Sequence, residues 1–329
     1  MSQYQFLVRR GLQGLLVVWG VITVVFLLRF MTPGSPVDFI APIDAGPELR
    51  AQIARNLGLD QPIHVQYGQY LAGVLQGDMG YSYIRGRPAS EIIALRIPAT
   101  IELAVAATVV AIVFSIPLGV LSATRRHQPA DYAATGFSLL GISTPNFWLG
   151  IMLIMIVSVG LGILPTSRRP IGLLPALELL VFQFETIGIR AWVTHMILPA
   201  VTLGTYFTAM IVRLTRSGML DELGQPYVEA ARAKGLPETL VTYKHALRNT
   251  MIPIITVLGL QLGTLIGGAV ITEFVFNWPG LGTLIIDAIN VRDWPIIQGA
   301  LIVVGVGFVA INIVVDALYA RLNPRVSLE

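Results

Sequence analysis

Residues 215–251 read TRSGMLDELGQPYVEAARAKGLPETLVTYKHALRNTM and form a polar segment between two long apolar runs. Because charged side chains are costly in hydrocarbon, this segment is expected to lie in water at a membrane surface. Apolar residues nevertheless recur within it at helical spacing, at Leu220, Leu223, Tyr227 and Ala230 or Ala231. That spacing predicts an amphipathic helix rather than a loose linker.

A second helix is predicted directly after the first. Gly235 can adopt the left-handed conformation that ends a helix, Pro237 suits the first turn of the next one, and Glu238 complements the positive end of that helix. One face of the second helix carries Leu236, Leu240, Tyr243 and Leu247. A helix–glycine–helix unit with an apolar stripe at a membrane surface is suited to docking into the groove of a partner protein.

The composition places the chain in a membrane. Of its 329 residues, 54% are apolar and only 12% are charged, with a mean hydropathy of +0.72. An ordinary soluble domain carries about 25% charged residues. The net charge of +3 does not indicate nucleic acid, because the positive residues flank apolar runs and form no basic face. The absence of cysteine excludes disulfides and thiol catalysis, and the four histidines show no metal-ligand spacing.

Six apolar runs predict an all-α integral membrane protein with six transmembrane helices. They cover residues 12–31, 98–124, 133–164, 192–214, 252–275 and 296–315. This gives an N-terminal tail and first span at 1–31, an extracytoplasmic segment at 32–97, a transmembrane core at 98–320 that includes loop 215–251, and a tail at 321–329. Short helices are expected at 47–57 and 63–75, and an interfacial segment within the outer loop 167–191.

Several positions inside the spans have two readings. Pro145 should kink the third span, so Pro145 and Asn146 are candidates for a translocation path. The spacing of Gly259 and Gly263 favours close packing of helices, with a pore-facing strip as the alternative. Glu102 lies one turn from the membrane boundary, where a solvated or hydrogen-bonded carboxylate is favoured over a functional one.

Lysine and arginine set the orientation, because cytoplasmic loops are enriched in both. With six spans the two termini share a side with loop 215–251. That side holds twelve of the 22 basic residues, namely Arg9, Arg10, Arg125, Arg126, Arg213, Arg216, Arg232, Lys234, Lys244, Arg248, Arg321 and Arg325. The pattern predicts a multi-pass protein of the cytoplasmic membrane with both termini in the cytoplasm.

The residues of the loop also carry a resemblance. Glu229-Ala230-Ala231, followed by Gly235, resembles the "EAA" cytoplasmic loop of ABC-importer permeases. The run from Tyr227 to Pro253 is similar to the dipeptide/oligopeptide/nickel permease family in particular. Further similarities occur in order along the chain, at 33–36, 58–62, 77–80, 98–103, 145–148, 195–199, 273–282, 292–295 and 323–325. Together they resemble the first permease subunit of that family, the type with a long first outer loop.

The resemblance implies a heteromeric importer and a small cap on the outer face. A second homologous permease subunit would complete the pore, two ATP-binding subunits would bind the loop, and an extracytoplasmic binding protein would deliver the solute. The ATPase-coupling residues would be Glu229, Ala230, Ala231, Gly235, Leu236, Leu240, Tyr243 and Leu247. The chain lacks a Gly-x-x-x-x-Gly-Lys-Ser/Thr loop, so ATP and magnesium are expected on partner subunits and no cofactor or metal on this chain.

Short peptides are the expected solute, with nickel complexes, glutathione and sugars as alternatives within the same importer class. A rival from another class is a secondary transporter or channel that works alone. Such a protein favours paired charges at the middle of the membrane, and Glu102, Glu273 and Asp287 all lie toward the ends of spans. A purely structural membrane scaffold would leave the docking loop unexplained.

Overall fold

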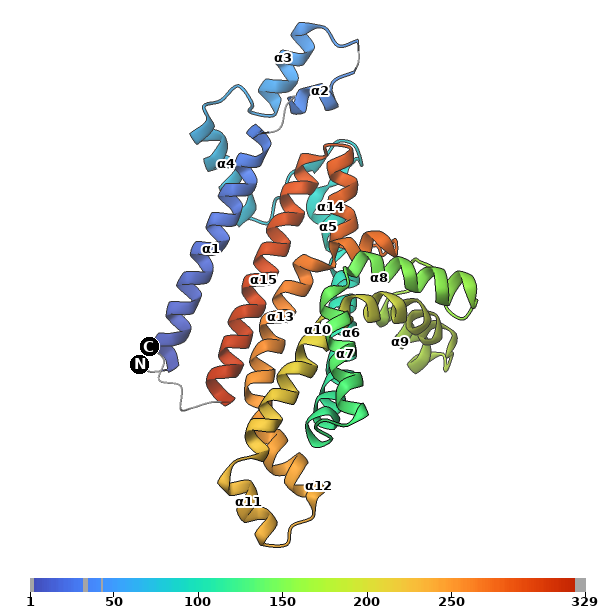
Figure 1. Cartoon of the computed structure of the whole chain (residues 1–329). Helices are drawn as coiled ribbons and strands as arrows, with labels where there is room; N and C mark the ends of the chain where they lie inside the picture. The colour runs from blue at the N-terminus through green and yellow to red at the C-terminus, as the bar shows by residue number, and fades with distance from the viewer. Residues whose placement is uncertain (1–2, 32–34, 43, 323–329) are drawn as a thin grey trace.

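The computed structural model describes residues 3–31, 35–42 and 44–322, and these are overwhelmingly helical. Four helices are long and apolar enough to cross a membrane: α1 (Gln3–Met31), α6 (Ile97–Thr124, which continues from α5, Ala89–Ala94), α10 (Ile187–Leu223) and α15 (Trp294–Leu322). They run side by side through the molecule (Figure 1). The predicted all-α membrane architecture is therefore confirmed.

Two bent helix pairs are also apolar enough to cross a membrane. The described chain therefore has four spans, or up to six if each bent pair counts as one span. The expected continuous third span is instead α7 (Pro129–Ser143) followed by α8 (Asn146–Leu153) and the π-helical segment η1 (Ile154–Gly160), with a bend of 108°. Pro145 lies at this break, where it cannot donate to the preceding turn. A helix of the length of α7 rises about 22 Å, short of the roughly 30 Å of a bilayer core.

The second pair contains the fifth predicted span. It comprises α12 (Glu238–Leu240), the π-helical segment η2 (Val241–Ala246) and α13 (Leu247–Val275), with a bend of 56° in the glycine-rich part of α13. The second helix predicted in the polar loop is therefore the beginning of the fifth span rather than a separate unit.

The main core lies between α6 and α10. Its buried side chains include Ala99, Leu103 and Ala107 of α6, and Leu203 and Ile211 of α10. Small residues let the two backbones approach closely: a Cβ on Gly204 would lie 2.8 Å from the carbonyl oxygen of Ala107. Close contact of this kind is how helices pack in lipid, where the hydrophobic effect between spans is absent.

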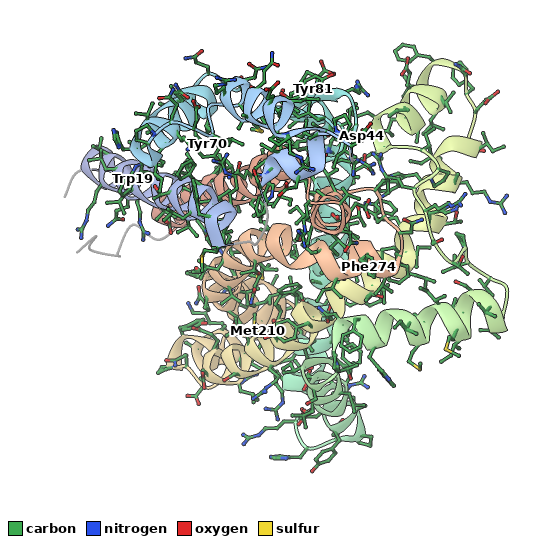
Figure 2. All side chains as sticks on the ribbon, turned by 90° about the horizontal axis from the view of Figure 1, so that it is seen from above. Trp19, Asp44, Tyr70, Tyr81, Met210 and Phe274 are labelled. Carbon is green, nitrogen blue, oxygen red and sulfur yellow. The ribbon has the colours of Figure 1, made fainter. Side chains whose placement is uncertain are left out.

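The segment predicted to be extracytoplasmic, called the outer segment after that prediction, forms α2 (Pro36–Ile40), α3 (Pro47–Asn56), α4 (Ile63–Leu75) and a small hairpin of β1 (Tyr81–Ser82) and β2 (Arg87–Pro88). The two expected short helices are thus confirmed as α3 and α4. Helix α4 packs against α1: the hydroxyls of Thr23 and Tyr67 lie 2.7 Å apart, and the rings of Phe26 and Tyr70 lie 5.3 Å apart. Figure 2 shows Tyr70 beside α1 from above.

Two short apolar helices complete the fold. Helix α9 (Leu173–Phe182) is the segment that the sequence placed in the outer loop at the membrane surface. Helix α14 (Leu281–Asn290) was not predicted, and its inner face packs against α5 and α15 through Leu284 and Ala288. The tail motif at 323–325 and the first half of the motif at 33–36 fall outside the described residues.

Candidate functional site

The polar loop forms a projection at one end of the molecule. Helix α11 (Pro226–Ala233) and α12 extend beyond the long helices, at the opposite end from α2 and α3 (Figure 1). The first residues of α1 and the last of α15 lie toward the same end as α11. The projection follows directly from α10 and leads directly into α13, so it connects two membrane-crossing elements.

The helix predicted from Leu220 to Ala231 is two helices. Helix α10 continues to Leu223 and ends at Gly224, and α11 begins at Pro226. Glycine is common just past the end of a helix. Proline is tolerated at the first position of the next helix, because a backbone N–H there would have no partner within the helix. The apolar spacing in the sequence therefore continued across a break in the backbone.

The inward face of α11 carries a small apolar cluster. Val228, Ala231 and Val241 are buried, and Leu223 and Leu236 pack against them. This cluster fastens α11 to the end of α10 and to η2. Of the predicted coupling residues, Ala231 and Leu236 are thus directed toward the protein itself, and the sequence analysis missed Val228 and Val241.

The outward face carries the open part of the predicted site. Glu229, Ala230 and Gly235 are exposed, and Tyr243 is 59% exposed. Gly235 has φ +76°, in the left-handed region that favours glycine, and a Cβ placed on it would meet no atom within 4 Å. A partner can therefore approach this backbone closely.

The predicted apolar stripe of the second helix is divided between two environments. Leu240 is half-buried, while Leu247 packs on a separate cluster that contains Val120, Met219 and Ala246. The stripe was expected to face a partner along its whole length. In the structure part of it holds the loop against α6 and α10, because η2 leads straight into α13.

A polar clamp joins α11 to both membrane-crossing neighbours. The Tyr227 hydroxyl donates to the carboxylate of Glu222 at the end of α10 and accepts from Asn249 Nδ2 at the start of α13, at 2.9 Å. Partial burial, and then the Glu222 carboxylate, raise the pKa of the Tyr227 phenol. Movement of α11 is thereby linked to α10 and α13. The sequence analysis did not identify Glu222 or Asn249, which come from separate helices.

An ion pair spans the turn at Gly235. Arg232 Nη2 lies 2.7 Å from Glu238 Oε1, and Arg232 Nε lies 3.1 Å from Glu238 Oε2. The Glu238 carboxylate raises the pKa of the Arg232 guanidinium. Both side chains are exposed, so the pair contributes about 0–1 kcal/mol and mainly orients the turn.

A second ion pair braces the same end of the bundle. The buried Asp131 of α7 accepts two hydrogen bonds from Arg216 of α10, at 2.6 and 2.9 Å, and a third from Ser122 of α6. Bidentate arginine–carboxylate geometry is strong and directional. Helices α6, α7 and α10 are thus held together where the projection begins.

The candidate path residues lie in different surroundings. Pro145 and Asn146 are at the bend between α7 and α8. Gly259 and Gly263 both pack against α15. A Cβ on Gly259 would lie 2.2 Å from Val315 Cγ1, and a Cβ on Gly263 would lie 3.2 Å from the Phe308 ring. The structure therefore places these two glycines in a helix–helix contact.

Glu102 belongs to a structural network at the outer end. Its carboxylate accepts from Arg169 Nη2 at 2.6 Å, from Trp192 Nε1 at 2.9 Å and from the Leu173 backbone nitrogen at 2.9 Å. These contacts attach the outer loop before α9 to α6 and α10. The favoured reading of Glu102 as a hydrogen-bonded group near the interface agrees with this geometry.

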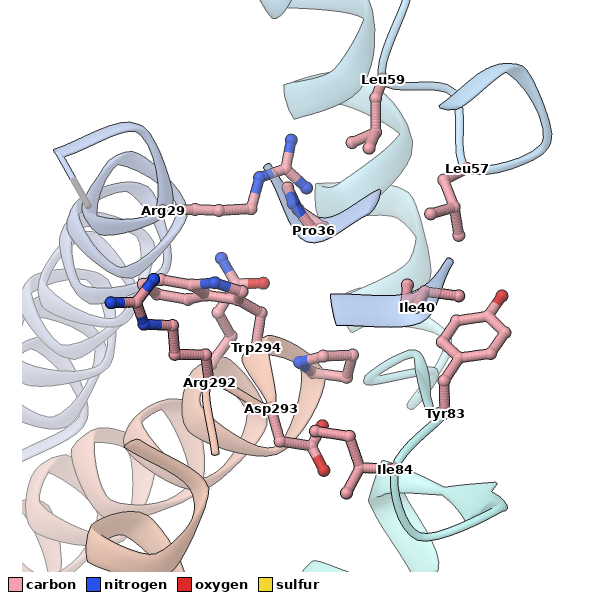
Figure 3. A pocket seen from close by; sticks show the side chains of 12 residues that line it. Arg29, Pro36, Ile40, Leu57, Leu59, Tyr83, Ile84, Arg292, Asp293 and Trp294 are labelled. Atoms are coloured by element: carbon pink, nitrogen blue, oxygen red, sulfur yellow. The ribbon is translucent and has the colours of Figure 1, made fainter. Parts of the chain in front are cut away.

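A cavity of about 130 Å³ lies beneath the outer segment. Figure 3 shows Arg29 of α1, Pro36 of α2 and Trp294 of α15 around it. Arg29 Nη2 donates to Gln66 Oε1 at 2.5 Å and its guanidinium lies over the Phe30 ring. The cavity separates the outer segment from the start of α15, at the far end of the molecule from α11.

Two family profiles match nearly all of the chain. Residues 3–104 match the N-terminal membrane component of binding-protein-dependent transport systems, and residues 115–328 match the binding-protein-dependent transport system inner membrane component. The chain belongs to this family. It is a permease subunit of an ABC importer, and not itself an enzyme.

Curated relatives cover the same length. The dipeptide transport system permease protein DppB of Escherichia coli (strain K12) is 43% identical, over 98% of both chains. The glutathione transport system permease protein GsiC of Salmonella choleraesuis (strain SC-B67) is 41% identical over 93% of both chains. The oligopeptide transport system permease protein AppB of Bacillus subtilis (strain 168) is 39% identical over 98% of both.

Proposed function

We propose that this permease imports short peptides, which an extracytoplasmic binding protein delivers, and that it is driven by separate ATPase subunits bound to α11. The observation that carries the coupling role is the open outward face of α11 with Gly235 beside it. This face projects from the membrane-crossing helices and is fastened to them by the Tyr227 clamp and the Val228 cluster. A bound ATPase can therefore transmit its movement to α10 and α13.

The peptide assignment is supported by the relatives. DppB and AppB are named for dipeptide and oligopeptide transport, and GsiC for glutathione, which is itself a small peptide derivative. All three align over more than nine-tenths of this chain. Nickel complexes and sugars remain the alternatives within the importer class.

The assembly we propose has three kinds of protein partner. A second homologous permease completes the pore, two ATP-binding subunits bind ATP and magnesium and dock on the projections, and the binding protein meets the outer segment. In this arrangement α11, both termini and the tail at 321–329 are cytoplasmic, while residues 32–97 form the extracytoplasmic cap. The position of α2 and α3 opposite α11 supports this orientation.

The test is uptake by the reconstituted complex. The chain is co-expressed with the neighbouring transporter subunits of its own source, purified as a complex and placed in proteoliposomes with ATP trapped inside. Addition of the binding protein with a radiolabelled dipeptide should give uptake that requires ATP hydrolysis. Equal uptake without ATPase subunits would instead support a secondary transporter or channel, and uptake of a nickel complex or sugar alone would overturn the peptide assignment.

A further inference from the structure

The lipid-facing surfaces of the described bundle are strongly apolar. Helix α1 exposes Leu12 and Leu16, and α6 exposes Val105, Val109 and Val113 at 52–57%. Such faces are expected wherever spans meet acyl chains, because an exposed polar group in hydrocarbon is costly. A polar exposed face at the same depth therefore needs a different neighbour.

One exposed face breaks this pattern, where α10 and α13 pack side by side. The residues of this face are exposed or half-buried, and each is either polar or a glycine. They recur at helical spacing along each helix. They are Tyr206, Arg213 and Ser217 of α10, and Gln261, Thr264 and Gly267 of α13, with the exposed Leu260 and Ile271 bordering them on α13. We call this set the polar lane. Gly267 adds open backbone to it, since a Cβ there would meet no atom within 4 Å.

Gln261 lies at the middle of the 29-residue helix α13. Its amide oxygen accepts from Thr264 Oγ1 at 2.9 Å, whereas its amide nitrogen contacts the thioether of Met210 at 3.5 Å. Met210, labelled in Figure 2, lies on α10 next to the polar lane. A thioether is a weak acceptor for an amide that has two N–H donors. At mid-membrane depth this arrangement suits a group that also meets water or a polar solute.

We propose that the polar lane lines the solute route of the assembled importer, and that Gln261 and Thr264 hydrogen-bond the backbone amides of a passing peptide. The proposal rests on the import function given above and adds the residues and the solute chemistry. In its middle the lane offers neutral donors and acceptors. Peptide groups would be recognised there through N–H and C=O, with little discrimination by side-chain charge.

The polar lane does not contain the positions that the sequence suggested for a translocation path. Gly259 and Gly263 lie on the face of α13 that packs on α15, whereas Gln261 and Thr264 lie on a different face. The bend at Pro145 belongs to α7 and α8, and α7 flanks α10 through Gly141 and Ala209. Helix α10 therefore contacts α7 at Ala209 and α13 at Met210, and the proposed route follows α10 and α13.

The first experiment measures water access. The chain has no native cysteine, so Thr264→Cys and the matched lipid-facing control Val109→Cys are made singly in the full complex. Both positions lie well inside their helices. A charged methanethiosulfonate reagent reacts with the thiolate, which forms in water and not in hydrocarbon. Modification of this chain is followed by mass spectrometry, with the complex open to the reagent from both sides.

The proposal predicts that Thr264→Cys reacts at least tenfold faster than Val109→Cys, and that saturating dipeptide with binding protein and ATP slows its reaction. Equal, slow labelling at both positions would overturn the proposal, because the lane would then be covered by lipid or by the second permease. This result does not depend on which solute is carried. A complex that imports no peptide but shows the labelling difference would refute the peptide assignment and keep the route.

The second experiment separates hydrogen bonding from packing. Gln261→Leu should lower kcat/KM for dipeptide uptake about tenfold, the effect of losing about one hydrogen bond in the transition state. Gln261→Asn should retain part of the uptake, and both variants should assemble with the ATPase subunits as the unmodified chain does. Unchanged uptake in Gln261→Leu would contradict the role given to this side chain.

Discussion

The Glu273 carboxylate caps helix α14 from another helix: its Oε2 lies 2.7 Å from the backbone nitrogen of Gly282. The same oxygen accepts from the Thr283 nitrogen, and Oε1 accepts from Thr100 Oγ1 at 2.6 Å. Glu273 is fully buried, so it replaces the missing partners of the first turn of α14. One side chain thereby ties α13, α14 and α6 together at the outer end.

Glu273→Ala should destabilise the protein strongly. It leaves buried donors without an acceptor, at about 1–3 kcal/mol for each group. We expect a thermal unfolding midpoint in detergent several degrees lower than that of the unmodified chain. Glu91→Ala is the matched control, because Glu91 is exposed and pairs only with Arg87 on the surface. Equal midpoints for the two variants would show that the cap contributes nothing.

The brace between Asp131 and Arg216 should be costly to break. Asp131→Ala leaves the partly exposed Arg216 and the buried Ser122 without their acceptor, at about 1–3 kcal/mol for a buried donor. Glu91→Ala, which removes an exposed pair with Arg87, should cost about 1 kcal/mol or less. The yield of monodisperse protein and its unfolding midpoint measure both variants. A larger effect at Glu91 would contradict the assigned burial.

The clamp at Tyr227 should affect coupling more than docking. Tyr227→Phe removes the hydroxyl that joins Glu222 to Asn249, an interaction of about 1 kcal/mol. We expect normal capture of ATPase subunits and about fivefold less solute imported per ATP hydrolysed. Tyr81→Phe is the control, since Tyr81 is an exposed tyrosine of the hairpin strand β1, outside the loop. An unchanged ratio in Tyr227→Phe would show that the clamp does not transmit movement.

The orientation can be tested with single cysteines, because the native chain has none. Asp44, Gln183 and Gln225 are exposed positions in the outer segment, after α9, and before α11. Cysteines at Asp44 and Gln183 should react with an impermeant reagent added outside cells. A cysteine at Gln225 should react only after permeabilisation, and outside labelling there would reverse the proposed topology.

Local sequence signals predicted much of this structure. Long apolar runs at α1, α6, α10 and α15 need no tertiary information, since their length alone indicates a span. The left-handed turn at Gly235 was also predicted from local sequence, and it is observed with φ +76°. Pro145 was correctly placed at a break, whereas the 108° change in direction was not predicted.

The features that were missed depend on residues far apart in the chain. Glu273 bonds to Thr100, 173 positions away, and Asn249 bonds to Tyr227, 22 positions away. Helix α14 is the exception: its apolar residues Leu281, Leu284, Ile285 and Ala288 have helical spacing, and that local pattern could have predicted it. Periodicity also ran across the break at Gly224, and for that reason Tyr227 was placed on an apolar stripe when its hydroxyl serves a polar clamp.

The central claim, that the outward face at Gly235 couples ATP hydrolysis to import, is tested most directly by Gly235→Asp in the reconstituted complex. Gly86→Asp is the matched control: Gly86 has φ +65°, no atom within 4 Å of a Cβ, and a place in the outer hairpin. Dipeptide uptake, ATP hydrolysis and capture of the ATPase subunits are measured on the same preparations. We predict that Gly235→Asp assembles in the membrane but loses ATPase capture, or hydrolyses ATP without uptake, whereas Gly86→Asp keeps both capture and hydrolysis. Normal uptake with normal solute-stimulated hydrolysis in Gly235→Asp would contradict the account.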